Sequence, residues 1–281
     1  SVRSFFENGG SSCYVVRMKT ALSTATVRNV TLNNDASSPA GLLKFSAGFR
    51  GAECIGDSYS TVGVSVSLSS RFTSSWVSST ASDMTADASI GDEAIRLQSV
   101  NGIVEGAVLK IEETASGTAT DHFVVVKSTE SFLESGAIVH QVNLTAALAS
   151  GIASADVKVT VLEYDLTVLD GGAAVETFQY LGLNPDADNY IETVINDSQV
   201  GSRFVKVEDL LASGALSTKV LSGLGAEVKL ATGGGDETVS PAVSDFIGDS
   251  NDRTGFYAIS GLDSVNLLCV PPSFENGRIG S

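Results

Sequence analysis

Short runs of apolar residues recur along the chain at strand-like spacing and predict a succession of β-strands. Residues 62–68 (VGVSVSL) alternate apolar and small polar side chains, which is typical of a strand with one buried face. Residues 42–47 (LLKFSA) predict another strand, followed by a glycine-rich turn over residues 47–52. The runs at residues 13–18 (CYVVRM) and 267–270 (LLCV) predict two buried strands, and two prolines end the second.

The segment between residues 83 and 163 contains predicted strands only. Apolar runs separated by turn residues recur there roughly every ten to eighteen residues. These runs are residues 94–97, 108–111, 122–126, 137–140 and 157–161. Short strands at regular spacing are typical of a small barrel or sandwich. We therefore predict that residues 83–163 form an inserted all-β, barrel-like domain whose two chain crossings lie side by side.

Apolar residues at helical intervals lie on both sides of this segment. They are Val2, Phe5 and Phe6 near the start, and Val175, Phe178, Leu181, Tyr190, Ile191, Val194 and Ile195 after it. Residues 184–188 (NPDAD) predict a turn that also caps a helix beginning near Asn189. The predicted fold class is therefore α+β, with a mixed sheet-and-helix core domain made of residues 1–82 and 164–281.

The composition indicates a folded chain that is large enough for one large domain or two ordinary ones. Of its 281 residues 43% are hydrophobic and 18% are charged, which excludes a disordered protein. No stretch reaches the ~18 to 20 apolar residues of a membrane helix. The first residues also lack the apolar run of a signal peptide. We expect neither a membrane span nor export.

The charge balance narrows the class of partner. There are 17 basic and 33 acidic residues, so the formal net charge is −16. Nucleic acids and anionic lipids are bound through clustered lysine and arginine, which this chain does not offer. We expect no nucleic-acid partner and no membrane partner.

The residues that most often bind metals are few and scattered. His122 and His140 lie in predicted strands with no HExxH or CxxC motif beside them, so structural or solvent-facing roles are the simpler interpretation. Cys13, Cys54 and Cys269 are odd in number and far apart, which suggests neither a disulfide framework nor a zinc site. We interpret them as reduced thiols.

Three glycine-rich or acidic turns resemble ligand-binding loops only superficially. Residues 233–237 (GGGDE) lack the lysine of a phosphate loop, and their carboxylates repel phosphate. Residues 186–189 and 249–252 lack the glycine and the final glutamate of a calcium loop. No GxSxG motif is present, and we expect no serine, histidine and carboxylate to converge in a pocket. We therefore predict no catalytic, cofactor-binding or metal-binding residues, no cofactor and no enzyme.

Parts of the chain resemble a known family. Residues 2–17 (VRSFFENGGSSCYVVR) strongly resemble the helix, Gly-Gly and strand signature of contractile tail sheath proteins of bacteriophages and related injection machines. Residues 43–51 (LKFSAGFRG) look like the strand that enters a glycine-rich turn in that family. The following residues Ala52, Glu53 and Cys54 depart from the Gly-aromatic-Gly-Asn motif that is usual there.

Later segments extend the resemblance. Residues 175–196 are similar to the sheath segment in which two short helices precede a strand, and residues 245–271 match the run into a buried strand that ends at proline. The likeness covers residues 1–72 and 165–272, on either side of the predicted insert. Inserted domains are familiar in this family, where they lie on the outside of the sheath.

The resemblance implies a mechanical function. Sheath subunits stack as hexameric rings around the tail tube above a baseplate, and terminal arms add strands to the sheets of neighbouring subunits. Contraction of this lattice drives the tube through the host envelope without ATP or an active site. The implied location is the virion, with the host cytoplasm during assembly. The N-terminal arm and the C-terminal portion of the family are missing here, so this chain alone is expected to be a monomer.

A binding protein of another class remains an alternative. A strand-rich, Ser/Thr/Gly-rich and acidic chain also suits a carbohydrate-binding or adhesion module. Such a module presents a cluster of exposed aromatic side chains over a groove. Aromatic residues make up 7% of this chain, and Trp76 is its only tryptophan, so the sequence offers few residues for such an aromatic cluster.

Overall fold

A computed structural model of the protein describes Phe6, Gly9, Cys13 and residues 26–55, 59–76, 82–114, 119–234, 243–250 and 254–259. The predicted helix at residues 2–6 and the predicted strands at 13–18 and 267–270 lie almost entirely outside the described residues. Residues 27–234 form one compact unit, and the two terminal stretches belong to a second. In the second unit the described elements are helix α3 (Val243–Ile247) and the 3-10 turn η3 (Gly255–Ile259).

The first sheet of the 27–234 unit is antiparallel and is centred on β2. Strand β2 (Gly41–Phe49) pairs with β1 (Asn29–Asn33) on one side and with β12 (Val205–Asp209) on the other, and the short β3 (Ala52–Glu53) continues its hairpin. Six of the nine residues of β2 are buried and they point to both faces of the sheet, which explains why apolar residues occupy adjacent positions at Leu42 and Leu43.

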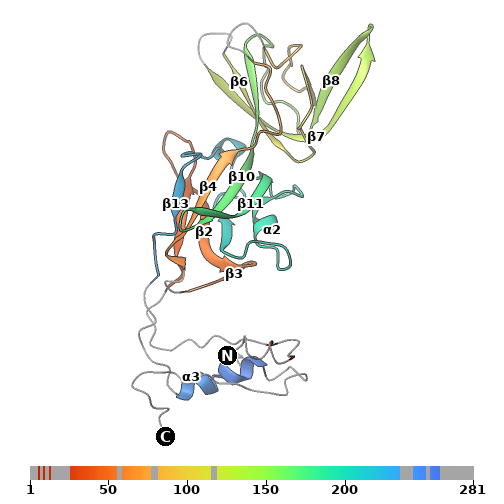
Figure 1. Ribbon diagram of the computed structural model, residues 1–281. Coiled ribbons are helices and arrows are strands. Elements are labelled where there is room, and N and C mark those ends of the chain that lie inside the picture. The colour runs from red at the N-terminus through yellow and green to blue at the C-terminus, as the bar shows by residue number, and fades with distance from the viewer. Residues whose placement is uncertain are drawn as a thin grey trace. The chain divides into compact units, whose positions relative to one another are not determined.

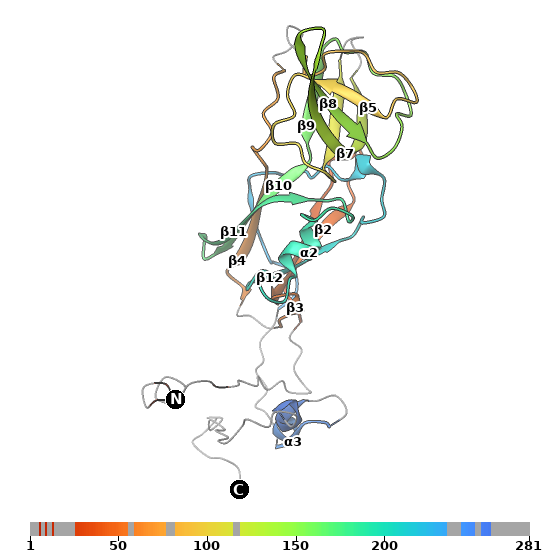
Figure 2. The same ribbon diagram turned by 90° about the vertical axis from the view of Figure 1, so that its right-hand side faces the viewer.

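The second sheet is also antiparallel and has the strand order β11, β10, β4, β13 (Figures 1 and 2). The strand bounds are β4 Val62–Leu68, β10 Glu163–Asp170, β11 Ala173–Gly182 and β13 Glu227–Lys229. The inner faces of the two sheets share one hydrophobic cluster, which includes Phe45, Val64, Leu166 and Val207. The core domain is therefore an antiparallel β-sandwich.

A third sheet lies between β4 and β10 in the sequence. Its five antiparallel strands run in the order β5, β8, β7, β6, β9. Their bounds are β5 Ala94–Leu97, β6 Val108–Glu113, β7 Thr120–Glu134, β8 Ala137–Leu144 and β9 Val157–Val161. This sheet has its own buried cluster, with Leu109, Ile111, Val126 and Val142 at its centre.

Three hairpins close with the two-residue turns that suit the right-handed twist of paired strands. Both residues of each turn have positive φ, as a type I′ turn requires. The turns are Arg50 and Gly51 after β2, Ser135 and Gly136 after β7, and Gly171 and Gly172 after β10. The glycine-rich turn predicted after residue 47 is thus the first of these hairpins.

The predicted α+β core is wrong, because the segment after residue 164 folds as strands. Phe178 and Leu181 are three residues apart, yet their partners Leu166 and Tyr164 in β10 are only two apart. The extra residue forms a β-bulge, at which Tyr180 has φ 62°. A bulge gives a strand the apolar spacing of a helix, and this is why periodicity predicted helix here.

The helical content of the core is limited to one short helix and a 3-10 turn, η2 (Leu216–Thr218), within the described residues. Helix α2 (Ile191–Ile195) begins close to the predicted start, but residues 184–188 do not cap it: its N-cap residue is Tyr190, and no side chain bonds its first turn. The Asn189 amide donates to the carbonyl of Tyr180 at 2.6 Å and to Glu163 at 3.0 Å. No described helix is long and apolar enough to cross a bilayer.

The third sheet contacts the sandwich at a defined junction. Val108 of β6 is buried within the core cluster of the sandwich. The Asn184 amide donates to the carbonyl of Gly106 at 2.8 Å. Glu163, whose side chain is 1% exposed, binds Arg71 through both carboxylate oxygens, with Nε to Oε2 at 3.0 Å. Burial raises the pKa of Glu163, an effect that Arg71 and Asn189 oppose.

Candidate functional site

Pairing of β6 with β7 brings His122 and Glu113 together at one end of the third sheet. His122 lies opposite Ile111, and Glu113 lies two residues farther along β6 on the same face. The His122 Nε2 atom is 3.3 Å from Oε2 of Glu113. Both side chains are largely buried, with 10% and 18% exposure. Because a carboxylate only accepts hydrogen bonds, Nε2 carries the proton in this pair.

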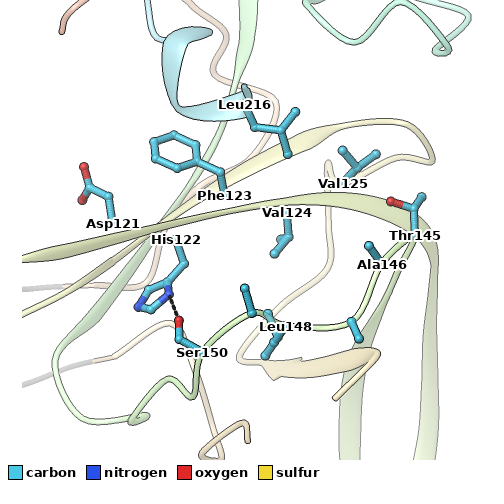
Figure 3. A pocket seen from close by; sticks show the side chains of 12 residues that line it. Asp121, His122, Phe123, Val124, Val125, Thr145, Ala146, Leu148, Ser150 and Leu216 are labelled. Carbon is cyan, nitrogen blue, oxygen red and sulfur yellow. Dashed lines mark hydrogen bonds between the residues drawn. The ribbon is translucent and has the colours of Figure 1, made fainter. Parts of the chain in front are cut away.

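The loop that follows β8 places Ser150 against the other nitrogen of the same ring. The Ser150 hydroxyl lies 3.2 Å from His122 Nδ1 (Figure 3). Two further contacts fix the loop: Glu113 Oε1 accepts from the Ala153 N–H at 3.2 Å, and Asp87 accepts from the N–H and the hydroxyl of Ser154. These bonds from Ser154 lower the pKa of Asp87.

The ring of His122 and the Ser150 hydroxyl line a cavity of about 300 Å³. On one side of β7 the side chains of His122 and Val124 point toward the loop that follows β8, which contributes Leu148 and Ser150 to the cavity wall (Figure 3). On the other side Phe123, Val125 and Leu216 meet, the last contributed by η2 of the sandwich. The cavity is thus lined by aliphatic side chains together with the polar groups of Asp121, His122, Thr145 and Ser150, and its surface is about equally polar and apolar.

We expected no serine, histidine and carboxylate to converge in a pocket; here Ser150 and His122 line the cavity, while Glu113, which bonds His122, is not among its lining residues. Glu113, His122 and Ser150 are separated by 9 and 28 positions in the sequence. They form no local motif, so only strand pairing and the loop bring them together. Neither Glu113 nor Ser150 was identified from the sequence.

The second histidine forms a simpler pair. The Ser131 hydroxyl lies 2.7 Å from His140 Nδ1 across β7 and β8, near the end of an exposed hairpin. No hydrogen-bonded carboxylate accompanies His140 among the described residues. The described residues therefore contain two serine–histidine pairs, of which Ser150–His122 has a hydrogen-bonded carboxylate and borders the cavity.

The other residues singled out in the sequence serve as turns or lie apart. Asn184 accepts a hydrogen bond from the backbone of Asp186, which makes residues 184–187 a turn. Cys54 is half-buried and Cys13 is exposed, both as free thiols, and Cys269 lies outside the described residues. Within the described residues, no group of three histidine, cysteine or acidic side chains is arranged to hold a metal ion. Residues 235–237 and 251–252 of the two other turns are not described.

A second polar cluster is enclosed in the sandwich core. The Lys219 ammonium is 3.0 Å from Asp209 Oδ2, and the Tyr190 hydroxyl is 3.3 Å from the same oxygen. The Lys219 and Asp209 side chains are 2% and 0% exposed. Burial and the charge of Asp209 raise the pKa of Tyr190. Because both charged side chains are enclosed and Lys219 also donates to the carbonyl of Ala212, we interpret this cluster as a structural ion pair.

The edges of the sandwich differ in how they are covered. The segment that contains α2 lies beside the outer edge of β12 (Figure 2). Its side chains occupy that edge: Asn196 donates to the carbonyl and accepts from the N–H of Val207, and Glu192 accepts from the N–H of Asp209. Side chains thus replace a neighbouring strand and block further pairing there.

The outer edge of β11 is not covered in this way. Strand β11 pairs with β10 on one side, and no described strand pairs with residues 173–181 on the other. Two residues of this range contact other segments: Glu176 accepts from the Ser202 hydroxyl at 2.6 Å and the Arg203 N–H at 3.0 Å, and Tyr180 accepts from the Asn189 amide at its carbonyl and lies under Arg71. Val175 is 42% exposed. An edge of this length is able to accept a further strand.

Comparison with known proteins yields little. No protein family matches the chain, and no curated protein matches it. Among solved structures, the tailspike protein gp49 from Pseudomonas phage LKA1 is 19% identical, over 32% of this chain and 15% of that one, with a TM-score of 0.22. A likeness of this size carries no argument about fold or function.

Proposed function

We propose that the chain is a structural subunit of a contractile bacteriophage tail sheath. In this role copies of the protein form hexameric rings around a tail tube, above a baseplate, and contraction of the lattice drives the tube through the host envelope. The protein is then part of the virion and is present in the host cytoplasm during assembly. The supporting observations are the sequence resemblance and one feature of the sandwich.

That feature is the uncovered edge of β11, and it carries the proposal. A sheath built by strand addition needs a sheet edge that is long enough to pair and is reserved for a specific partner. Strand β11 has ten residues and two register irregularities, near Val168 and near Tyr164 of its partner β10. Bulges of this kind discourage indiscriminate pairing, while the backbone between them stays available.

The resemblance and the fold support the proposal unequally. The sheath signature at residues 2–17 lies almost entirely outside the described residues, so it remains an inference from the sequence. The sandwich differs from the α+β core that the spacing of apolar residues predicted. The sheath family and this structure have in common a core domain that is discontinuous in sequence and interrupted by a strand-rich insert.

The described surface offers little to the alternative, a carbohydrate-binding module. Sugar-binding aromatic side chains lie together and present a free ring face. Here Phe49, Tyr180 and Trp76 lie on separate elements, and a cation covers each: Arg50 at 5.5 Å, Arg71 at 4.7 Å and Lys158 at 5.6 Å from the ring centre. No cluster of free aromatic faces is present among the described residues.

Electron microscopy of the protein expressed from its complete gene tests the proposal. The sheath interpretation requires tubes, and dispersed particles would overturn it. A Val175→Lys substitution places a charge on the edge of β11 and is expected to abolish tubes without loss of folded structure. Ile90→Lys is the matched control, because Ile90 is 72% exposed in a turn ahead of β5, in the third-sheet part of the chain. Tubes that persist unchanged in Val175→Lys would remove β11 from the assembly mechanism.

A further inference from the structure

We propose that Ser150, His122 and Glu113 form a hydrolytic site for small neutral esters. The proposal goes beyond the structural role and does not depend on it. It rests on three features that occur together at one place in the third sheet: a hydrogen-bonded series of serine, histidine and carboxylate, an adjoining cavity, and free backbone N–H groups.

The hydrogen bonds assign a role to each side chain. Glu113 accepts at His122 Nε2, so the proton of the neutral imidazole is held on that nitrogen. The lone pair of Nδ1 then faces the Ser150 hydroxyl, 3.2 Å away, where it acts as general base. Ser150 and His122 are the catalytic residues, and Glu113 is a positioning residue that fixes the ring and its tautomer.

The backbone beside Ser150 offers N–H groups that have no partner among the described residues. The N–H groups of Ala149, Ser150 and Gly151 donate no hydrogen bond to any described residue. Neighbouring N–H groups in this loop are engaged, since Leu148 donates to Asp92 and Ile152 donates to Ala88. The three free groups lie next to the nucleophile in sequence, as donors to a tetrahedral intermediate do.

The cavity selects the class of substrate. About 300 Å³ lined by Val124, Leu148 and alanine side chains accommodates a short acyl chain. Asp121 lies at the wall, and the whole chain carries a net charge of −16, which disfavours anionic esters. A neutral ester with a short acyl group therefore suits the site best.

The chemistry proceeds by acyl transfer in two balanced steps. The Ser150 oxygen attacks the ester carbonyl carbon as its proton passes to His122 Nδ1. The tetrahedral intermediate then expels the alcohol, which leaves with that proton, and an acyl-serine remains. Water attacks the acyl-serine, gives a proton to His122, and releases the carboxylic acid as Ser150 regains its proton. No oxidant, metal or cofactor takes part in these steps.

A purely structural role predicts a different pattern of contacts. The loop is already held in place by the hydrogen bonds of Glu113 with Ala153 and of Asp87 with Ser154. Ser150 is exposed, so water alone could satisfy its hydroxyl, and the hydrogen bond to His122 is not required to hold the loop. Its placement at the cavity is the feature that a latch leaves unexplained.

The site is tested with a fluorophosphonate probe and with p-nitrophenyl acetate and butyrate. We expect the probe to add one label, located on Ser150 by peptide mass spectrometry, and we expect ester hydrolysis above background. Ser150→Ala should lose both. His122→Ala should lower kcat at least ~100-fold, in line with the usual contribution of a general base. Glu113→Gln should lower kcat with little change in KM.

The second serine–histidine pair provides the matched control. Ser131→Ala removes a hydroxyl bonded to His140, which has no carboxylate partner among the described residues, and should leave labelling and hydrolysis unchanged. Thermal unfolding confirms that each variant is folded. Absence of labelling in the folded wild-type protein overturns the proposal. So does a Ser150→Ala variant that loses thermal stability but keeps hydrolysis, because the cluster is then a latch. Neither result depends on whether tubes form.

Discussion

Leu68, the last residue of β4, lies directly opposite Tyr164 of β10. The Ser69 N–H continues the ladder by donating to the carbonyl of Glu163 at 2.8 Å. The chain therefore leaves the sandwich and re-enters it on adjacent strands, as Figure 1 shows for β4 and β10. An insertion between neighbouring strands of an antiparallel pair can be replaced by a short turn without moving either strand.

Removal of the insert should leave the sandwich folded. A variant that lacks residues 74–161 and has a short Gly-Ser linker in their place keeps Arg71 and Glu163 together. We expect cooperative urea unfolding with a smaller m-value, and a stability about 2 to 5 kcal/mol lower, because packing of Val108 and its neighbours on the sandwich is lost. Non-cooperative unfolding would show that the two parts do not fold separately.

The turn after β2 should tolerate no side chain at its second residue. Gly51 has φ 80°, and a Cβ atom there would lie 2.5 Å from the Asn196 carbonyl oxygen. We expect Gly51→Ala to cost about 2 to 4 kcal/mol, from backbone strain and the clash together. Gly172→Ala is the control, since Gly172 has φ 84° with open space around it and should cost only about 1 to 2 kcal/mol. Equal costs in urea unfolding would contradict the role of the Asn196 contact.

Sequence periodicity predicted the strands whose side chains face a core on one side. Strands β4, β5 and β9 have the bounds expected from the sequence, because burial of one face imposes alternation. The second half of β7, from residue 127 to 134, was missed. It forms a two-stranded hairpin with mostly exposed side chains, such as Leu133 at 75%, so no buried face leaves a pattern.

The bulges of β11 and the candidate site escaped prediction for a different reason. Both depend on which strands pair, and at what register, and a single sequence does not contain that information directly. Phe178 and Leu181 appear helical until Tyr164 and Leu166 are seen opposite them. Likewise His122 gains its carboxylate only when β6 and β7 align.

Loss of the buried ammonium should be costly in the sandwich core. Lys219→Met leaves Asp209 buried and without its cation, although Tyr190 and the Leu211 N–H still donate to it. We expect a loss of about 3 to 5 kcal/mol in chemical denaturation. The matched control is Lys206→Met, whose ammonium is 3.4 Å from Glu53 on the surface, with an expected change of at most about 1 kcal/mol. If Lys219→Met lowers the free energy of unfolding no more than Lys206→Met does, Asp209 is not left as an uncompensated buried charge.

Alkaline pH should destabilise the sandwich through Tyr164. This side chain is fully buried, its hydroxyl donates to the carbonyl of Lys219 at 3.1 Å, and it accepts from the Leu221 N–H at 3.2 Å. Burial raises the pKa of Tyr164 to about 12, against about 10 for a tyrosine in the unfolded chain.

The sign of the effect follows from which state keeps its proton. Below pH ~10 both states hold the Tyr164 proton, and the stabilisation is complete. Between pH ~10 and ~12 only the folded state holds it, so the free energy of unfolding falls by about 2 to 3 kcal/mol across that window. Urea unfolding at a series of pH values measures this slope, and Tyr164→Phe should make it shallower, with the remainder due to Tyr190, whose pKa burial and Asp209 also raise. The same slope in both proteins would show that Tyr164 does not retain its proton in the folded state.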